Sequence, residues 1–364
     1  MSGMDRDPLR VLADVVGIYS PTKREGRLAK FLVKEMRSLG YEDPHVDEAG
    51  NAVGHSGSGR LRVLLCGHMD TVPGKLPVRV TKRAIYGRGA TDAKSPLCAL
   101  LFAGAKAAES GASVTFAGVT DEEGAGRGVQ GLISRRQKYD FAVFGEPAGS
   151  RRVTVGYRGR MSLQIKVESG GGHAGSPWAH SSAFDLFCYA VSKLRGYAES
   201  TQTGEDHFRS VSVTPTIVRS GDYQNVLPSF CDATLDVRVP PGLSCADVQK
   251  TLVEILSGLE PRDAFRYSFS EPTEPYEVDP NSLLVRAFQR AIILKTKAKP
   301  LMVRKTGTGD MNTFAAATRA QCVTFGPGET GLSHTDDEMV YLRDYLESIE
   351  VLKESISQLS LLSK

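Results

Sequence analysis

The sequence has no cysteine pairs of the kind that bind a metal or form a disulfide framework. Its six cysteines are scattered along the chain, at positions 66, 98, 188, 231, 245 and 322. Scattered cysteines are typical of free thiols in a reducing compartment, so we expect a cytoplasmic protein. No stretch approaches the ~20 apolar residues that a membrane helix needs, and the charged N-terminus MSGMDRDPLRVL does not resemble a signal peptide. We therefore expect no association with a membrane.

The chain also lacks a strong excess of charge of either sign. The formal net charge is +3, and no runs of Lys and Arg alternate with aromatic residues. Proteins that bind nucleic acid depend on such basic surfaces, so we exclude a nucleic-acid partner. The overall composition, with 41% hydrophobic and 24% charged residues, is typical of a globular protein. A length of 364 residues favours two domains rather than one.

Short apolar runs alternate with helical segments over much of the chain. Runs rich in β-branched residues predict four strands: 61–66, 114–119, 142–144 and the CVTFGPG segment. Amphipathic segments at 96–109 and 129–137 predict helices between them. This alternation favours an α/β sheet, and polar residues follow several of the strands directly. Open α/β folds bind ligands at that edge of the sheet.

The middle of the chain has a different pattern. Strand and helix signals follow one another as strand, helix, strand, strand, helix and strand: 161–167, 181–194, 210–218, 230–239, 246–256 and 265–269. This order is typical of a small ferredoxin-like α+β domain, which we place at 158–270 as an insertion in a catalytic domain formed by 1–157 and 271–364. The insertion has 11 Lys/Arg and 12 Asp/Glu, a charge of −1, so the net +3 leaves +4 for the catalytic domain. A positive catalytic domain is compatible with an acidic partner.

Two segments near predicted strand ends or turns carry aspartate. His68 and Asp70 leave the first strand as an HxD sequence, either as a metal-binding imidazole whose second N–H is accepted by Asp70 or as a capped turn. Asp92 lies in YGRGATDAKSP, whose glycines fit neither GxxxxGK[ST] nor a GxGxxG nucleotide motif. We predict that Asp92 bridges two cations, because two positive charges would keep its carboxylate ionised.

Acidic residues follow two further strands. Glu122 and Glu123 are adjacent in TDEEG, where they form either a solvated acidic turn or, beside a cation, a ligand and a general base. We assign Glu123 as the ligand and Glu122 as the base. Glu146 in FGEPAG and His334 in GLSHTDDE add a carboxylate and a second imidazole. Such mixed ligation suits two ions of Zn²⁺, Co²⁺ or Mn²⁺ and predicts hydrolysis of an amide or peptide bond.

The chain resembles the M20 family of two-metal hydrolases. It carries the family's motifs in order: GHMDTVP, YGRGATDAK, TDEEG, FGEP, GGHAGSP and SHTDDE. The resemblance covers nearly the whole chain and implies a metallopeptidase-like α/β catalytic domain with an inserted lid and dimerisation domain. It also implies that His68, Asp92 and Glu146 hold one ion. Asp92, Glu123 and His334 would hold the other, with Zn²⁺ or Co²⁺ as the metals.

The resemblance gives roles to residues outside the metal set. His173 in GGHAGSP matches the family's lid histidine, which reaches the active site of a neighbouring subunit and helps to hold the oxyanion. This implies a homodimer formed through the inserted domain. Asn225 in QNVLP and Arg238 in LDVRVP match positions of substrate contact. Gly307 and Thr308 of KTGTGDMN join them as predicted substrate contacts.

Two segments, GIYSPTKREG and KTGTGDMN, resemble the branch of the family that releases lysine or ornithine from the amino-group carrier protein LysW. LysW is small and acidic, and the side chain of its C-terminal glutamate is amide-linked to the α-amine of the amino acid. Alternatives in the same fold are a deacylase of acetylornithine or succinyl-diaminopimelate and a small-peptide peptidase. A non-catalytic binding protein is disfavoured because every ligand position and the base position are filled.

At two positions the chain departs from the pattern that it resembles. Ala93 follows Asp92 where the family often has a second acid. The peptide bond at that point is usually cis in the family, and Ala93 leaves its isomer open. Gly309 stands where the LysW branch commonly has serine.

Overall fold

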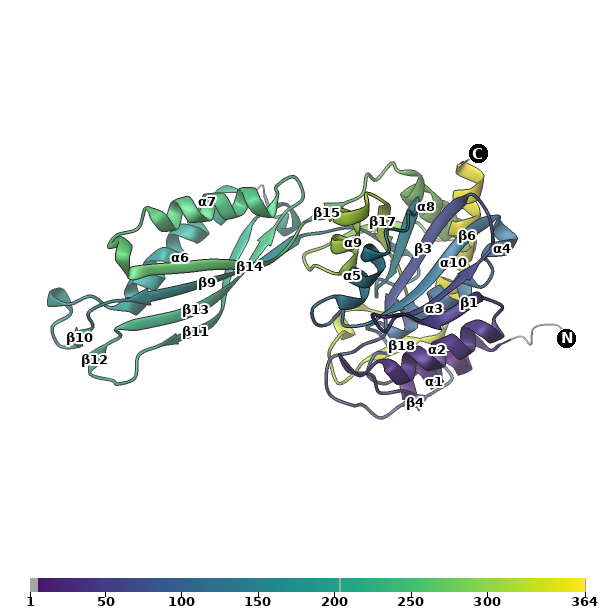
Figure 1. The fold of residues 1–364 in the computed structure, drawn as a ribbon, viewed down its shortest axis with the longest axis horizontal. Helices are drawn as coiled ribbons and strands as arrows, with labels where there is room; N and C mark the ends of the chain where they lie inside the picture. The colour runs from purple at the N-terminus through teal and green to yellow at the C-terminus, as the bar shows by residue number, and fades with distance from the viewer. Residues whose placement is uncertain (1–5, 203, 364) are drawn as a thin grey trace. The chain divides into compact units, whose positions relative to one another are not determined.

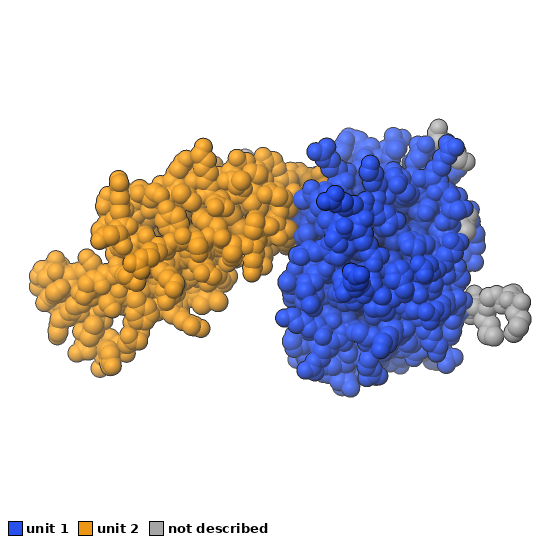
Figure 2. Space-filling model, viewed as in Figure 1, with its two compact units in different colours: residues 1–155, 278–303, 309–364 blue, residues 156–277, 304–308 orange. Residues whose placement is uncertain are grey.

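The computed structural model describes residues 6–202 and 204–363, which divide into two compact units (Figure 2). Unit 1 comprises the chain up to Val155, Val278–Val303 and the chain from Gly309 onward. Unit 2 comprises Gly156–Glu277 and Arg304–Thr308. The segment 158–270, predicted as an insertion, lies within the longer stretch of unit 2. Among the described residues, no helix is long and apolar enough to cross a membrane.

Unit 1 is built on a sheet whose central strands are parallel (Figure 1). Four parallel strands run side by side in this order: β6 (Ala112–Val119), β3 (Leu61–His68), β7 (Phe141–Gly145) and β17 (Gln321–Thr324). Antiparallel strands extend the sheet on both sides: β2 (Ala52–Ser56) and β1 (Glu42–Val46) beyond β6, and β8 (Arg152–Tyr157) beyond β17. The central strands are buried almost throughout, as expected where both faces of a sheet are covered.

Helices cover both faces of this sheet. Gly145 faces Pro96 and Leu100 of α3, whereas Phe144, one residue earlier, faces Phe314 of α9 with 5.6 Å between the ring centroids. Because successive residues of a strand point to opposite faces, α3 and α9 lie on opposite sides of the sheet. The helices of unit 1 are α1 (Pro8–Gly17), α2 (Gly26–Ser38), α3 (Lys94–Gly104), α4 (Ala107–Ser110), α5 (Arg127–Ser134), α8 (Leu283–Thr296), α9 (Asp310–Thr318) and α10 (Leu342–Leu362).

One predicted helix, 96–109, is two helices in the structure. All residues of α3 are buried, and the helix ends at Gly104. The chain then reaches the surface, where Lys106 and Glu109 are exposed and form an ion pair at 2.9 Å. The single-helix prediction is wrong because an apolar run buried on all sides gives way to a solvent-exposed turn, a change that periodicity alone does not mark.

Unit 2 is an antiparallel sheet with two helices. Its strands lie in the order β11 (Ser212–Ser220), β13 (Phe230–Val239), β9 (Gly159–Glu168) and β14 (Phe265–Thr273). Residues along β9 alternate between buried and exposed, and the buried ones form a core with α6 (Ala183–Ser200) and α7 (Cys245–Ser257). The predicted succession of strands and helices is therefore confirmed. Together with the mainly parallel sheet of unit 1, it confirms the predicted fold class.

Short elements complete the structure. A small three-stranded sheet contains β4 (Arg79–Val80), β5 (Ala84–Tyr86) and β18 (Met339–Tyr341). The pair β10 (Gly172–His173) and β12 (Val226–Leu227) stands apart from the larger sheet of unit 2. The others are β15 (Tyr276–Glu277), β16 (Leu301–Lys305) and the 3-10 turns η1 (Pro177–Ala179), η2 (His207–Arg209), η3 (Arg262–Ala264) and η4 (Thr330–Leu332).

Candidate metal centre

The carboxyl ends of three parallel strands gather the predicted site residues. His68 is the last residue of β3, Glu146 directly follows β7, and Glu122 and Glu123 lie just beyond the end of β6. Because β6, β3 and β7 are neighbours and run in the same direction, these side chains meet at one edge of the sheet. Two loops add the remaining residues: Asp92 before α3 and His334 after η4.

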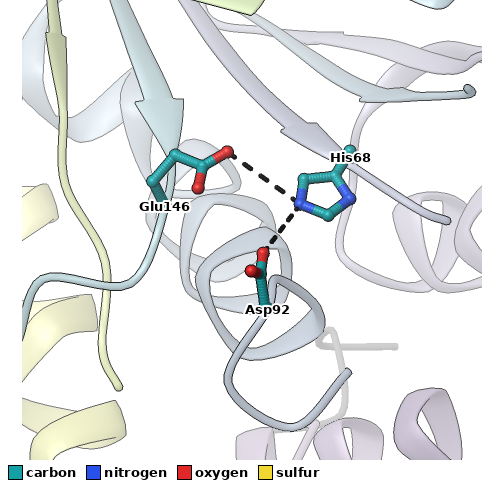
Figure 3. Close-up of side chains that lie close together, drawn as sticks. All are labelled: His68, Asp92 and Glu146. Carbon is teal, nitrogen blue, oxygen red and sulfur yellow. Dashed lines mark hydrogen bonds and ion pairs between the residues drawn. The ribbon is translucent and has the colours of Figure 1, made fainter. Parts of the chain in front are cut away.

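The side chains form two groups that share Asp92. In the first, His68 Nε2 lies 3.2 Å from Asp92 Oδ1 and 3.9 Å from Glu146 Oε1 (Figure 3). In the second, His334 Nε2 lies 2.9 Å from Glu123 Oε1 and 3.4 Å from Asp92 Oδ2. Within each group the nearest donor atoms all lie within 4.8 Å of one another. Asp92 therefore offers one oxygen to each group, as a carboxylate that bridges two cations would.

Asp70 has a different hydrogen-bond arrangement from the predicted one. The nearest acceptor for His68 Nδ1 is the backbone oxygen of Asp70 at 2.9 Å, while its carboxylate lies 3.6 Å away. The fully buried carboxylate instead accepts the backbone N–H groups of Glu122 and Glu123, both at 3.1 Å, and the hydroxyl of Thr22. Asp70 thus fixes the tautomer of His68 mainly through its main chain, and its side chain holds the Glu122–Glu123 turn.

The pKa values of the clustered carboxyl groups indicate whether cations fit the site. Burial raises the pKa of Glu122 well above its usual value, and the carboxylates of Glu146 and Asp310 raise it further. Burial also raises the pKa of Glu123, with Asp92 adding to the rise, and it raises the pKa of Asp310 to about 7. Asp310 Oδ2 is buried with no hydrogen-bond partner among the described residues. Divalent cations remove this repulsion, and the imidazole and carboxylate donors are those that Zn²⁺ and Co²⁺ accept, so the residues fit two such ions.

Two acidic residues near the site have no role in the sequence analysis. Asp310 begins α9 and lines, with Glu122 and Glu146, a narrow space beside His68. Glu338 is buried behind the loop that carries Asp92. The SHTDDE motif contains Glu338 and the KTGTGDMN segment contains Asp310, but neither segment shows which of its polar residues is buried. The Asp92–Ala93 peptide bond, left open above, is cis.

The predicted residues of unit 2 form two separate pairs. His173 is exposed on β10, and its neighbour Ala174 donates a backbone hydrogen bond to the backbone oxygen of Asn225. Arg238 donates to the hydroxyl of Thr308 at 2.9 Å and forms an ion pair with Asp236. Gly307 precedes Thr308 in the same short stretch of unit 2.

These two pairs lie at opposite ends of the unit 2 sheet. Arg238 is opposite Arg160 near the start of β9, whereas His173 lies beyond Glu168, where β9 ends (Figure 1). The eight steps from Arg160 to Glu168 span roughly 26 Å in an extended strand. His173 and Arg238 of one chain are therefore too far apart to contact the same small substrate.

Comparisons with known proteins extend over nearly the whole chain. The profile of peptidase family M20/M25/M40 matches residues 64–358. A Pyrobaculum aerophilum protein provisionally named [LysW]-lysine/[LysW]-ornithine hydrolase is 36% identical over 97% of this chain and 98% of its own length. A Deinococcus radiodurans protein named [LysW]-lysine hydrolase is 34% identical over 96% of both chains.

Solved structures share the fold at low sequence identity. A tripeptidase from Staphylococcus aureus superposes with a TM-score of 0.82 at 19% identity, over 97% of this chain and 98% of that one. A Bacillus subtilis protein described as a dinuclear metal-binding peptidase of the M20 family superposes with a TM-score of 0.72 at 12% identity, over 98% and 97%. At these identities the likeness establishes the fold.

The mainly parallel sheet, the two groups of possible metal ligands at its edge and the family profile together define a metallohydrolase that acts on carbon–nitrogen bonds. The predicted enzyme class is confirmed. More narrowly, the chain belongs to peptidase family M20/M25/M40, so the predicted membership of M20 is confirmed as well.

Proposed function

We propose that this enzyme hydrolyses the amide bond between the side-chain carboxyl of the C-terminal glutamate of LysW and the α-amine of lysine or ornithine, in lysine or arginine biosynthesis. The observation that carries the proposal is full-length similarity, at 34–36% identity, to relatives named as hydrolases of such adducts. Both groups of possible ligands and the adjacent Glu122 support a hydrolytic role.

In this proposal His68, Asp92 and Glu146 hold one divalent ion, and Asp92, Glu123 and His334 hold the other. When bound, Zn²⁺ or Co²⁺ ions supply Lewis acidity toward the amide carbonyl and lower the pKa of water. Glu122 belongs to neither group of ligands, and its backbone is held by Asp70 beside both. Its carboxylate takes the proton from the attacking water and later gives it to the leaving α-amine.

His173 is proposed to donate a hydrogen bond to the oxyanion. Its Nδ1 accepts the backbone N–H of Gly175 at 2.9 Å, so a neutral ring carries its proton on Nε2 and can donate it. The distance along β9 between His173 and Arg238 favours an arrangement in which each acts on a different substrate molecule. We therefore propose a homodimer in which His173 serves the active site of the neighbouring subunit. Asn225, beside His173, would contact the same substrate molecule as His173, while Arg238, Gly307 and Thr308 would contact the other one.

Substitution of His173 by alanine is expected to lower kcat by roughly 10²-fold, the lower range for loss of one oxyanion donor. Metal content should stay at the wild-type value, because His173 belongs to neither group of possible ligands. Steady-state kinetics and elemental analysis of the same sample measure both quantities. His207→Ala, at another exposed histidine of unit 2, is the control. Wild-type turnover in His173→Ala would remove His173 from the oxyanion role.

A hollow of about 670 Å³ on unit 1 supports the carrier half of the proposal. Five cationic side chains line it: Lys82, Arg83, Arg151, Arg152 and Arg343. Among the described residues, the side chains of the first three have no ion-pair or hydrogen-bond partner. Three carboxylates also line the hollow, and each has a partner: Asp344 accepts the backbone N–H groups of Ser150 and Gly328, Glu329 pairs with Arg152, and Glu347 pairs with Arg343. Long cationic side chains without partners match the many separate negative charges on an acidic protein better than they match a single phosphate group.

Removal of three of these charges, in Lys82→Ala/Arg83→Ala/Arg151→Ala, is expected to raise KM for the LysW adduct about tenfold at low salt, with kcat unchanged. The difference from the wild type should shrink as ionic strength rises, because exposed charges are screened. The triple variant Lys30→Ala/Lys34→Ala/Arg290→Ala removes the same number of exposed cations elsewhere on unit 1. Equal KM values for the two triple variants would contradict docking at the hollow.

The experiment that tests the proposed function compares substrates directly. Purified LysW–lysine and LysW–ornithine adducts are incubated with the metal-loaded enzyme, in parallel with acetylornithine, succinyl-diaminopimelate and small peptides. We expect release of lysine, ornithine or both from the adducts. Cleavage of an acylated amino acid or peptide with both adducts intact would overturn the carrier proposal and leave the metallohydrolase class in place.

A further inference from the structure

Glu338 is a buried carboxylate whose hydrogen bonds all converge on the Asp92 loop. Only 1% of its side chain is exposed. Its Oε1 accepts the backbone N–H groups of Gly89 at 2.9 Å, Thr91 at 3.1 Å and Asp92 at 2.9 Å. A buried charge is costly unless it is paired and hydrogen-bonded, and three amides aimed at one oxygen meet that condition.

Arg88 links this carboxylate to the loop that carries His334. Its guanidinium, 7% exposed, donates to Glu338 Oε2 at 3.0 Å and to the backbone oxygen of Thr335, the residue after His334, also at 3.0 Å. A third bond goes to the backbone oxygen of Gly74 at 2.9 Å, and the exposed carboxylate of Asp336 lies 3.8 Å from the guanidinium. The ion pair therefore fastens two segments that are remote in sequence, 88–92 and 334–338.

The ligands on these two segments lie outside the regular elements, and the segments are joined by few contacts besides this ion pair: Thr91 donates to the backbone oxygen of Met339, and the N–H of Gly87 donates to that of Glu338. Asp92 lies just before α3 and His334 just after η4, so neither is held inside a regular element. His334 also has a left-handed backbone, with φ of 64°, and half of its side chain is exposed. By contrast, His68 and Glu146 are at or next to the ends of buried strands. Metal affinity requires that the ligand atoms are held in place to within about half an ångström. The ion pair contributes to this for both ligands, because Glu338 binds the N–H of Asp92 and Arg88 binds the carbonyl of Thr335, next to His334.

We propose that Glu338, with Arg88, is a positioning residue for the ion held by Asp92, Glu123 and His334. By fixing the backbone N–H of Asp92 and, through Arg88, the carbonyl of Thr335, it sets the spacing between Asp92 and His334 and so the affinity of this group for its ion. The inference rests on the ligand roles proposed for Asp92 and His334, and it is independent of the identity of the carrier.

Zinc titration of the metal-stripped protein by calorimetry tests this role, with cobalt absorption as a second readout. In Glu338→Gln an NH₂ group replaces one carboxylate oxygen. This group cannot accept a hydrogen bond, and it faces either the three backbone N–H donors or Arg88, so the network loses at least one bond. We expect affinity for one of the two ions to fall at least tenfold and for the other to fall less, because the second ion shares only Asp92 with the disturbed segments. Because the groups that react are untouched, excess zinc should restore kcat to within threefold of the wild type.

Two further variants separate positioning from general loss of structure. Arg88→Lys keeps the positive charge but loses the planar guanidinium that donates to both segments, so we expect the same selective weakening. This variant provides the test if Glu338→Gln does not fold. Asp47→Asn is the matched control, since Asp47 is a 2% exposed carboxylate that accepts the backbone N–H of Asn51 at 2.8 Å and pairs with Arg135 at 3.0 Å. It should lower the unfolding temperature without changing zinc affinity.

Two results would overturn the inference. In the first, Glu338→Gln and Arg88→Lys both bind two ions within twofold of wild-type affinity. In the second, Asp47→Asn weakens zinc binding as much as they do. Failure of the wild-type protein to bind two ions is a separate outcome, because it would contradict the metal centre itself.

Discussion

Replacement of Glu122 by glutamine is expected to lower kcat by roughly 10³- to 10⁴-fold, the upper part of what a positioned general base contributes. The glutamine amide has nearly the shape of the carboxylate but cannot take a proton from water. Both ions should remain bound, because Glu122 is in neither group of possible ligands. Steady-state release of amine and elemental analysis of the same sample provide the two measurements.

Glu123→Gln is the informative partner of this variant, because the two residues are adjacent and both backbones are held by Asp70. Glu123 Oε1 lies 2.9 Å from His334 Nε2, so we expect loss of an ion from Glu123→Gln. If Glu122→Gln loses an ion while Glu123→Gln keeps two, the roles of base and ligand are reversed. If Glu122→Gln keeps near wild-type turnover, Glu122 is not the base.

Replacement of Asp92 by alanine is expected to abolish hydrolysis, by more than roughly 10⁴-fold, because both ions lose a ligand at once and the site depends on their Lewis acidity. The two oxygens of Asp92 face different histidines, His68 at 3.2 Å and His334 at 3.4 Å. Elemental analysis after dialysis should show less than one ion per chain. The physical reason is that no other residue belongs to both groups.

Glu146→Ala is the control variant for the bridging role of Asp92. Glu146 belongs only to the group of His68, so its loss should remove one ion and leave the other near wild-type affinity. Two ions retained by Asp92→Ala would contradict the bridging role. Equal losses in Asp92→Ala and Glu146→Ala would show that the ions bind cooperatively rather than through separate groups.

The sheet and the meeting of the strand-end residues were predictable from sequence. Apolar runs that end in His68, Glu122 or Glu146 mark strands, and parallel neighbours bring their carboxyl ends to the same edge. His334 has no periodic signal in its loop, and it was predicted as a ligand only as part of the set formed with His68 and the acidic residues. The motif resemblance was needed to give His173 any role at all.

The hydrogen bonds that hold the site together were not predictable. Glu338 and Asp92 are 246 residues apart, and nothing in local sequence shows that a carboxylate will meet three backbone N–H groups. The predicted bond from His68 to the carboxylate of Asp70 differs from the structure for a related reason. The turn after β3 brings the carbonyl of Asp70 closer to the imidazole and leaves its carboxylate for the N–H groups of the next loop. Such choices depend on the path of loops, which hydrophobic patterning does not specify.

The separation of His173 from Arg238 shows what strand register adds. The sequence predicts that both residues belong to one inserted domain, but it does not predict the distance between them. The pairing of β9 with β13 puts Arg238 beside Arg160 and the other end of β13 beside Glu168. That spacing supports a second subunit as part of the working active site, and it makes the His173→Ala experiment informative about assembly as well as chemistry.

The most direct test measures lysine and ornithine released from purified LysW adducts by metal-stripped enzyme, before and after addition of Zn²⁺ or Co²⁺. We expect no release from the stripped enzyme. Release should appear as the protein takes up two ions per chain, and Glu122→Gln should remain inactive at the same metal content. Release without metal would contradict the role of the ions, and intact adducts in the presence of two bound ions would contradict hydrolysis of LysW adducts.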